Sequence, residues 1–178
     1  MNFSILDKDS KDEVANLFTS VFSSSEGEQE GRLIGNLASV LAWRTENLEI
    51  ICIGAYADRA MIGAIFFSRL RFDEPIEAYM LAPVAVSTAH QGRGNGQALI
   101  RFGLQVLRNR FATVAVTYGD PAFYAKVGFQ ALSEGVIQAP LRLSMPEGWL
   151  GQSLSEGPIP ILNSRPACVQ EFDNPDYW

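Results

Sequence analysis

A glycine-rich turn is the stretch of this sequence whose residue types point most directly to chemistry. Residues 84–96 read VAVSTAHQGRGNG, with glycine at the three alternating positions Gly92, Gly94 and Gly96. The apolar residues that follow recur every three or four positions, which predicts an amphipathic helix. The first turn of a helix has amide N–H groups without partners and a partial positive charge, and glycine lets a ligand approach this backbone closely. The turn therefore predicts a phosphate or pyrophosphate site, with Arg93 available for a charge-assisted contact.

Two common nucleotide-binding motifs do not fit this turn. The dinucleotide motif G-x-G-x-x-G, started at Gly92, needs a glycine at the position that Gln97 occupies. The P-loop needs the triplet Gly-Lys-Ser or Gly-Lys-Thr, which the sequence does not contain. NAD, ATP and GTP are therefore disfavoured as ligands.

A different motif does fit. The pattern Gln91-x-x-Gly94-x-Gly96 resembles the pyrophosphate-arm motif Q/R-x-x-G-x-G/A of the GNAT acetyltransferase superfamily. Downstream, residues 123–129 (FYAKVGF) resemble its Y-x-x-x-G-F signature. The strings LAPVAV and GDPAFYAKVGF are most similar to the YhbS-like branch of that superfamily. The two motifs lie in register within residues 76–133, which makes the resemblance specific.

The resemblance implies an α/β fold with a mixed, mostly antiparallel central sheet, splayed central strands and flanking helices. Residue patterns agree with it, since they predict an edge strand, two helices, an antiparallel meander and a β-α-β unit. These elements are expected at residues 3–6, 10–23, 28–41, 49–56, 60–70, 76–86, 98–110 and 112–118. On the second helix, one apolar side is expected to carry Leu33, Ile34, Leu37, Val40 and Leu41. A chain of 178 residues is most simply one domain, residues 1–178.

The C-terminal part is harder to interpret. Residues 134–166 are rich in Gly, Pro and Ser and predict no element. Residues 167–172 are expected to form the last strand. The tail FDNPDYW could pack on the domain or on a partner subunit, which leaves a homodimer open.

The resemblance also implies a reaction, the direct transfer of an acetyl group from acetyl-CoA to a primary amine of a small molecule or peptide without a covalent enzyme intermediate. Backbone N–H groups of residues 92–97 would hold the pyrophosphate, and one in residues 84–86 would polarise the thioester carbonyl. Tyr124 would protonate the CoA thiolate. The expected cosubstrate-binding residues are Val84, Ala85, Val86, Gln91, Gly92, Arg93, Gly94, Asn95, Gly96, Gln97 and Tyr124.

The catalytic base is less clearly marked. Glu77 on the incoming strand and Glu30 at the start of the second helix, with Glu28 beside it, are candidates, and each could instead be a solvated surface carboxylate. A chain of waters could also serve. His90 is expected to be exposed rather than to act as the base.

Two further positions lie near the predicted acid. Thr117 stands where many members of the superfamily carry Asn. Asp120 either caps a short helix over residues 121–127 or contacts the substrate.

Composition narrows the class of protein. The net charge of −6 argues against nonspecific nucleic-acid binding and leaves room for a cationic amine. Two cysteines, Cys52 and Cys168, and the single His90 make no zinc-binding pattern, so no metal is expected. Cys52 is expected to be a buried thiol. Neither a signal pattern nor a long apolar run is present, which predicts a cytoplasmic protein without a membrane span.

Two other functions remain open from the sequence. One is a non-catalytic module that binds acyl-CoA as a sensor or regulator. The other is an acyltransferase that uses a longer or carrier-bound acyl donor, whose pocket Phe66, Phe67 and Phe72 could line if they are not part of the core.

Overall fold

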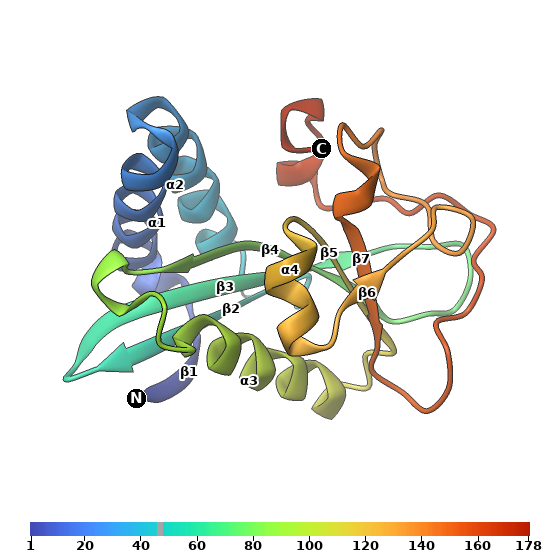
Figure 1. The fold of residues 1–178 in the computed structure, drawn as a ribbon, viewed down its shortest axis with the longest axis horizontal. Helices are drawn as coiled ribbons and strands as arrows, with labels where there is room; N and C mark the ends of the chain where they lie inside the picture. Colours follow the sequence, from blue (N-terminus) through green and yellow to red (C-terminus); the bar gives the residue numbers. More distant parts are fainter. Residues whose placement is uncertain (46–47) are drawn as a thin grey trace. The chain divides into compact units, whose positions relative to one another are not determined.

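The computed structural model describes residues 1–45 and 48–178 and contains a seven-stranded sheet in the order β1-β2-β3-β4-β5-β7-β6 (Figure 1). Pairing is parallel between β4 and β5 and antiparallel in the pairs β1–β2, β5–β7 and β6–β7. The predicted mixed, mostly antiparallel sheet is thus confirmed, with β1 at its edge. The strands are β1 (Asn2–Leu6), β2 (Ile50–Ala57), β3 (Ala60–Leu70), β4 (Ala78–Val86), β5 (Val114–Tyr118), β6 (Gln130–Ala131) and β7 (Trp149–Ser153).

The described residues also form four α-helices: α1 (Lys11–Glu26), α2 (Glu28–Trp43), α3 (Asn95–Asn109) and α4 (Pro121–Tyr124). None of the helices in the described part of the chain is both long and apolar enough to cross a membrane. The chain divides into two compact units, the first formed by residues 1–67 and 83–103 and the second by residues 68–82 and 104–178.

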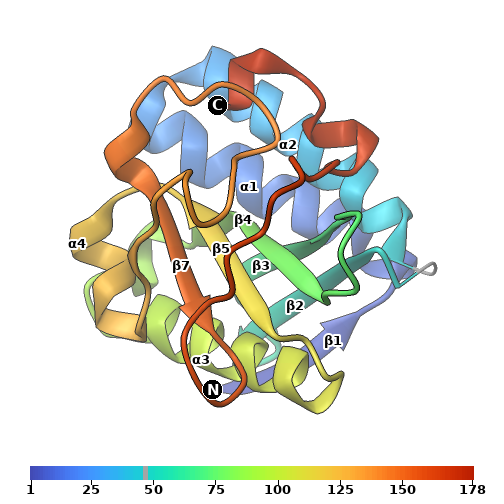
Figure 2. The same ribbon diagram turned by 90° about the vertical axis from the view of Figure 1, so that its right-hand side faces the viewer.

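In the first unit, helices pack on both faces of the strands (Figure 2). Phe18 of α1 lies against Phe66 of β3, with ring centroids 5.7 Å apart. Phe67, the next residue of β3, lies against Gly103 of α3, where a Cβ atom would stand 2.5 Å from its ring. Because successive side chains of a strand point to opposite faces, α1 and α3 cover opposite faces of β3. Phe66 and Phe67 are fully buried core residues.

The helical hairpin α1–α2 departs from the prediction in two ways. The serine-rich segment does not end α1 at residue 23, because the hydroxyl groups of Ser24 and Ser25 donate to carbonyl groups one turn earlier. The helix continues to Glu26 and is capped by Gly27, whose φ is 101°. On α2, Leu33 and Val40 are exposed rather than part of the apolar side, because the contact with α1 is narrower than the apolar arc of the sequence.

The turn between β2 and β3 confirms the predicted hairpin. Asp58 and Arg59 both have positive φ, 49° and 68°, the conformation of a two-residue turn that matches the twist of the paired strands.

In the second unit, β5 pairs along its whole length with β7, from Val114↔Ser153 to Tyr118↔Trp149. The last strand is therefore β7 and not residues 167–172, which was predicted wrongly. Ala167 forms an isolated bridge with Arg71, and Gln170–Phe172 is a turn of 3-10 helix.

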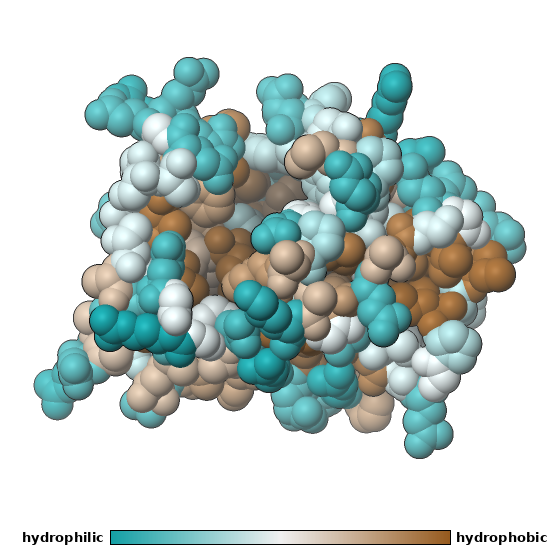
Figure 3. Space-filling view, in the orientation of Figure 1, coloured by the Kyte–Doolittle hydropathy of each residue, from teal (hydrophilic) through white to brown (hydrophobic). Residues whose placement is uncertain are grey.

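The C-terminal tail packs within the second unit. Trp178 is buried, stacks on Tyr118 and donates its indole N–H to the carbonyl of Phe172 at 2.9 Å. Apolar residues also gather on the surface over the loops of this unit, at the right-hand edge of the view in Figure 3. Ile161 and Met145 are exposed apolar side chains in the loops of the second unit.

Candidate active site

The glycine-rich turn has the open backbone that the sequence predicts. Gly92 and Gly94 have φ of 72° and 78°, in the left-handed region that favours glycine. A Cβ atom at either position would meet nothing within 4 Å, so the backbone conformation, and not crowding, requires glycine there. The same open space leaves the turn accessible to a ligand.

Side chains of the turn hold its own backbone. Gln91 donates its Nε2–H to the carbonyl of Val86, and Asn95 donates its Nδ2–H to the carbonyl of His90, each at 2.8 Å. His90 in turn donates its backbone N–H to the carbonyl of Ser87. These bonds fix the path of the chain from the end of β4 to the start of α3.

The turn ends at the N-terminus of α3. Ala98 N–H makes a bond of the helical i→i−4 type, to the carbonyl of Gly94 at 2.9 Å. The N–H groups of Asn95, Gly96 and Gln97 belong to the first turn, where helices lack intrahelical acceptors. Together with the helix dipole they form an anion-binding arrangement.

His90 is half-buried, whereas its position before the glycine-rich turn predicts an exposed side chain. Its Nδ1 atom lies 3.5 Å from Ser87 Oγ, because the short 3-10 turn of residues 88–90 folds the side chain back on the end of β4. Arg93 is exposed on the turn.

The end of β4 presents backbone N–H groups. Ser87 donates its N–H to the carbonyl of Ile62 in β3. Because the N–H groups of successive strand residues point to opposite edges, those of Val86 and Val84 point to the edge of β4 away from β3. Pairing of β4 with β5 runs from Ala78↔Val114 to Leu81↔Thr117, while β4 continues to Val86. This is the pattern expected of strands that splay apart.

Tyr124 is the last residue of α4 in the second unit. Asp120 caps this helix by accepting the N–H of Ala122 at 2.8 Å, which confirms the capping interpretation of that aspartate. The ring of Tyr124 packs edge-on against Phe129, with centroids 5.8 Å apart. Gly119 also lies close to this ring, because a Cβ atom there would come within 2.8 Å of Cε2.

The hydroxyl of Tyr124 is kept neutral. Burial raises its pKa, the negative charge of Asp120 raises it further, and a hydrogen bond with the Thr117 side chain acts in the opposite direction. With a pKa raised above its ordinary value near 10, the phenol is protonated at neutral pH and has the form that a proton donor needs.

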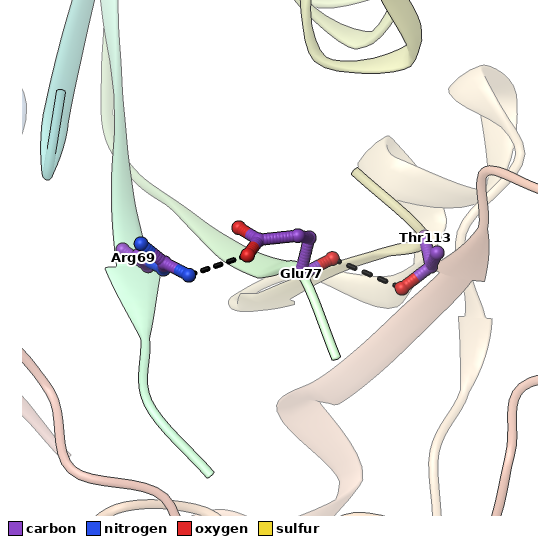
Figure 4. A network of polar contacts seen from close by, with 3 residues as sticks. All are labelled: Arg69, Glu77 and Thr113. Carbon is purple, nitrogen blue, oxygen red and sulfur yellow. Dashed lines mark hydrogen bonds and ion pairs between the residues drawn. The ribbon is translucent and has the colours of Figure 1, made fainter. Parts of the chain in front are cut away.

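The candidate bases lie in different surroundings. Glu77 forms an ion pair with Arg69 at 2.5 Å, and its backbone carbonyl accepts the hydroxyl of Thr113 at 3.0 Å (Figure 4). Glu28 is exposed and pairs with Arg32 one turn along α2 at 3.2 Å. Glu30 is half-buried at the start of the same helix. The role of Glu77 or Glu30 as base stays a prediction.

Metal-ligating side chains do not gather among residues 1–45 and 48–178, since no group of three or more His, Cys, Asp or Glu there could hold a metal ion. Cys52 is buried, as predicted, and this burial strongly raises its thiol pKa.

Sequence reasoning missed the environment of the predicted acid. Gly119 packs against the ring of Tyr124, and the string GDPAFY is the only feature of the sequence that indicates their proximity. The side chains of Gln91 and Asn95 bond to backbone carbonyl groups of the turn. The backbone N–H groups of the turn, and not these side chains, are therefore available to a ligand.

A statistical model of the acetyltransferase (GNAT) family matches residues 11–129, and the chain therefore belongs to this family of N-acetyltransferases. Over 167 residues it is 29% identical to an uncharacterized N-acetyltransferase of Escherichia coli, YjhQ, with 89% of this chain and 87% of that protein covered.

Solved structures share the fold. The crystal structure of the Escherichia coli GNAT family N-acetyltransferase YhbS in complex with CoA matches with a TM-score of 0.79 at 20% identity, covering 97% of this chain and 92% of that one. A GNAT family acetyltransferase from Brucella melitensis in complex with acetyl-CoA matches with a TM-score of 0.69 at 24% identity, covering 97% of both chains.

Proposed function

We propose that this protein transfers an acetyl group from acetyl-CoA to a primary amine by direct attack, without a covalent enzyme intermediate. The observation that carries the proposal is the open, internally braced turn of residues 91–97 at the N-terminus of α3, whose backbone N–H groups suit a pyrophosphate. Structural relatives that were solved with CoA or acetyl-CoA support this choice of cosubstrate.

Each chemical step has a candidate group on this chain. The backbone N–H of Val84 or Val86 would stabilise the oxyanion that develops on the thioester carbonyl. Tyr124 would give its proton to the departing CoA sulfur. Glu77 or Glu30 would take the proton of the ammonium, and the net charge of −6 favours a cationic acceptor.

Substitution separates the two candidate bases. Loss of the true base should remove the acidic limb from the pH dependence of kcat, and loss of the other carboxylate should leave that limb in place. Glu77→Gln and Glu30→Gln are therefore compared across pH. If neither substitution changes the pH dependence of kcat, a chain of waters is favoured as the route for the ammonium proton.

The cosubstrate is tested by calorimetric titration of acetyl-CoA into the wild type, Gly94→Glu and Gly157→Glu. Gly157 also has positive φ, 92°, and open space around it, so its variant carries the same backbone strain and charge outside the loop. Binding should survive in Gly157→Glu and be lost in Gly94→Glu, where the carboxylate repels the pyrophosphate. A folded wild type that does not bind acetyl-CoA would contradict the proposal and favour a longer or carrier-bound acyl donor.

Turnover is tested separately with a panel of amines, from polyamines and aminoglycosides to peptides. Acetyl-CoA binding without transfer to any of these amines would favour the non-catalytic acyl-CoA module.

A further inference from the structure

Helix α2 carries apolar side chains on two sides. One side, which includes Ile34 and Leu41, is buried in the first unit. The other side carries Leu33, Val40 and Trp43, which keep 37%, 49% and 58% of their surfaces exposed. A helix that is apolar on both sides is typical of one that is covered on both sides, and grouped exposed apolar residues mark contact surfaces.

The exposed residues of α2 follow the spacing of a helix that packs along another helix. Gln29, Leu33, Asn36, Val40 and Trp43 are all exposed, and they alternate at intervals of four and three residues. This is the repeat of the two apolar positions in each heptad of a helix pair. We call these five residues the α2 stripe, and its spacing indicates a contact surface for a second helix.

The α2 stripe is nearly symmetric about its centre. Leu33 and Val40 flank Asn36 on its two sides, and Gln29 and Trp43 each stand seven residues from it. When two copies of α2 run antiparallel, Asn36 therefore meets Asn36 and Leu33 meets Val40. A two-fold interface requires such self-complementarity, because the same patch must serve both copies. A single asparagine in an apolar contact between helices also fixes their register.

Charges of opposite sign lie at the two ends of the α2 stripe. Glu28 is exposed at the start of the helix. At the other end, the ammonium groups of Lys8 and Lys11 lie over the ring of Trp43, 5.8 and 5.2 Å from its centroid. An antiparallel pair brings Glu28 of each copy to the lysines of the other, whereas a parallel pair brings like charges together.

Ion pairs within one chain do not compete strongly with this contact. Glu28 pairs with Arg32 at 3.2 Å, and Lys11 lies 3.8 Å from Asp12. Both pairs lie at the surface, where water screens the attraction and an ion pair contributes little.

We propose that two copies of this chain associate about a two-fold axis through antiparallel packing of their α2 stripes. Leu33 of each copy packs against Val40 of the other, and Trp43 lies beside Gln29 of the other copy. Because one helix face from each copy makes a small interface, the dimer is reversible and its Kd lies in the micromolar range. This association goes beyond the proposed acetyl transfer and does not depend on it.

Sedimentation velocity of the full chain over a series of concentrations measures the Kd of the dimer. Trp43→Ala should raise it at least about tenfold, because a two-fold interface loses the ring twice. Asn36→Leu should lower it, since a polar residue among apolar ones reduces the stability of a helix pair. Phe111→Ala is the control, because it removes another aromatic side chain, 85% exposed, outside α2 and should leave the Kd unchanged.

Two charge reversals test the antiparallel direction. Glu28→Lys and Lys11→Glu each oppose like charges at both ends of the dimer, so each variant alone should associate about three- to tenfold more weakly. An equal mixture of the two variants should recover most of the wild-type affinity, because every such contact of the mixed dimer joins opposite charges. A parallel pair would give a different result, since neither variant alone would then associate more weakly than the wild type.

Three results would overturn the proposal. One is a wild type that stays monomeric over the whole concentration series, which would leave the α2 stripe to a different partner. Another is a dimer whose Kd does not change in Trp43→Ala. The third is a mixture of the charge variants that associates no more tightly than either variant alone. Circular dichroism checks that each variant is folded, and every substituted side chain lies at the surface.

Discussion

At the scale of single residues, Tyr124 shows how one side chain is prepared by its neighbours. The sequence motif identifies the tyrosine, but not the glycine that its ring contacts. The contacts of the tyrosine ring depend on the path of the chain between β5 and α4. Residue types alone therefore do not predict them.

Gly119→Ala tests this arrangement. The added methyl group would lie 2.8 Å from Cε2 of Tyr124, so the ring must move. Because a displacement near 1 Å can cost up to about a hundredfold in rate, we expect kcat to fall roughly ten- to a hundredfold with a small change in KM.

Steady-state kinetics of a double-mutant cycle check the cause. In a Tyr124→Phe background, Gly119→Ala should have almost no further effect on kcat, because both changes act through the same hydroxyl. Gly135→Ala, a glycine-to-alanine change elsewhere in the same unit, serves as the control. Equal losses with and without the tyrosine would contradict the packing explanation.

At the scale of elements, regular patterns were predictable and irregular ones were not. The β2–β3 hairpin, α3 and β5 follow from apolar spacing and turn residues. β7 was missed because its sequence WLGQS is short and lacks alternation. Residues 167–172 are apolar enough for a strand, but they form a bridge and a 3-10 turn instead.

The glycine-rich turn was predicted in its position and not in its internal bonds. Asn95→Ala removes the bond to the carbonyl of His90, which is one of the two side-chain bonds that hold the turn. We expect the Kd for acetyl-CoA to rise about three- to tenfold, since a hydrogen bond of this kind contributes about 1 kcal/mol. Calorimetry measures the effect.

Asn109→Ala is the control, because Asn109 also forms a side-chain hydrogen bond, with Gln105, but at the exposed C-terminal end of α3. An unchanged Kd in Asn95→Ala would show that the turn keeps its shape without this bond.

The α1–α2 hairpin depends on close packing at Gly35. A Cβ atom there would stand 1.9 Å from Thr19 Oγ1 and 3.1 Å from its Cβ. Gly35→Ala should therefore lower the free energy of unfolding by about 1–3 kcal/mol.

Adding Thr19→Ala removes the nearest clashing atom and should recover much of that loss, helped by the higher helix propensity of alanine. Urea unfolding of the wild type, both single variants and the double variant gives the comparison. A double variant no more stable than Gly35→Ala would show that the backbone, and not the threonine hydroxyl, limits the approach.

At the scale of the whole molecule, polar contacts join segments far apart in sequence, and a carboxylate makes one of them. Within the second unit, Glu74 accepts the backbone N–H groups of Asn163 and Ser164 and the Ser164 hydroxyl. No pattern in the sequence predicted this contact, because the partners lie in the segment that showed no periodicity. The contact ties the C-terminal loop to the turn before β4.

These hydrogen bonds make the contact dependent on pH. They lower the pKa of Glu74 from 4.5 to about 2, because they favour the ionised carboxylate. A carboxylate whose folded pKa is depressed stabilises the fold above its unfolded pKa, and this contribution is lost as the pH falls toward its folded pKa. The stabilisation is therefore complete above a pH of about 5 and declines toward a pH of about 2.

Glu74→Gln should accordingly lower the Tm at neutral pH, and the difference from the wild type should shrink as the pH falls from about 5 to about 2. Glu156→Gln removes an exposed carboxylate of the same unit and controls for the change in net charge. Thermal unfolding across this pH range measures both variants. If Glu74→Gln lowers the Tm by the same amount at every pH, the ionised carboxylate does not hold the loop. The lower stability of the variant would then have a cause that does not depend on the ionisation of Glu74.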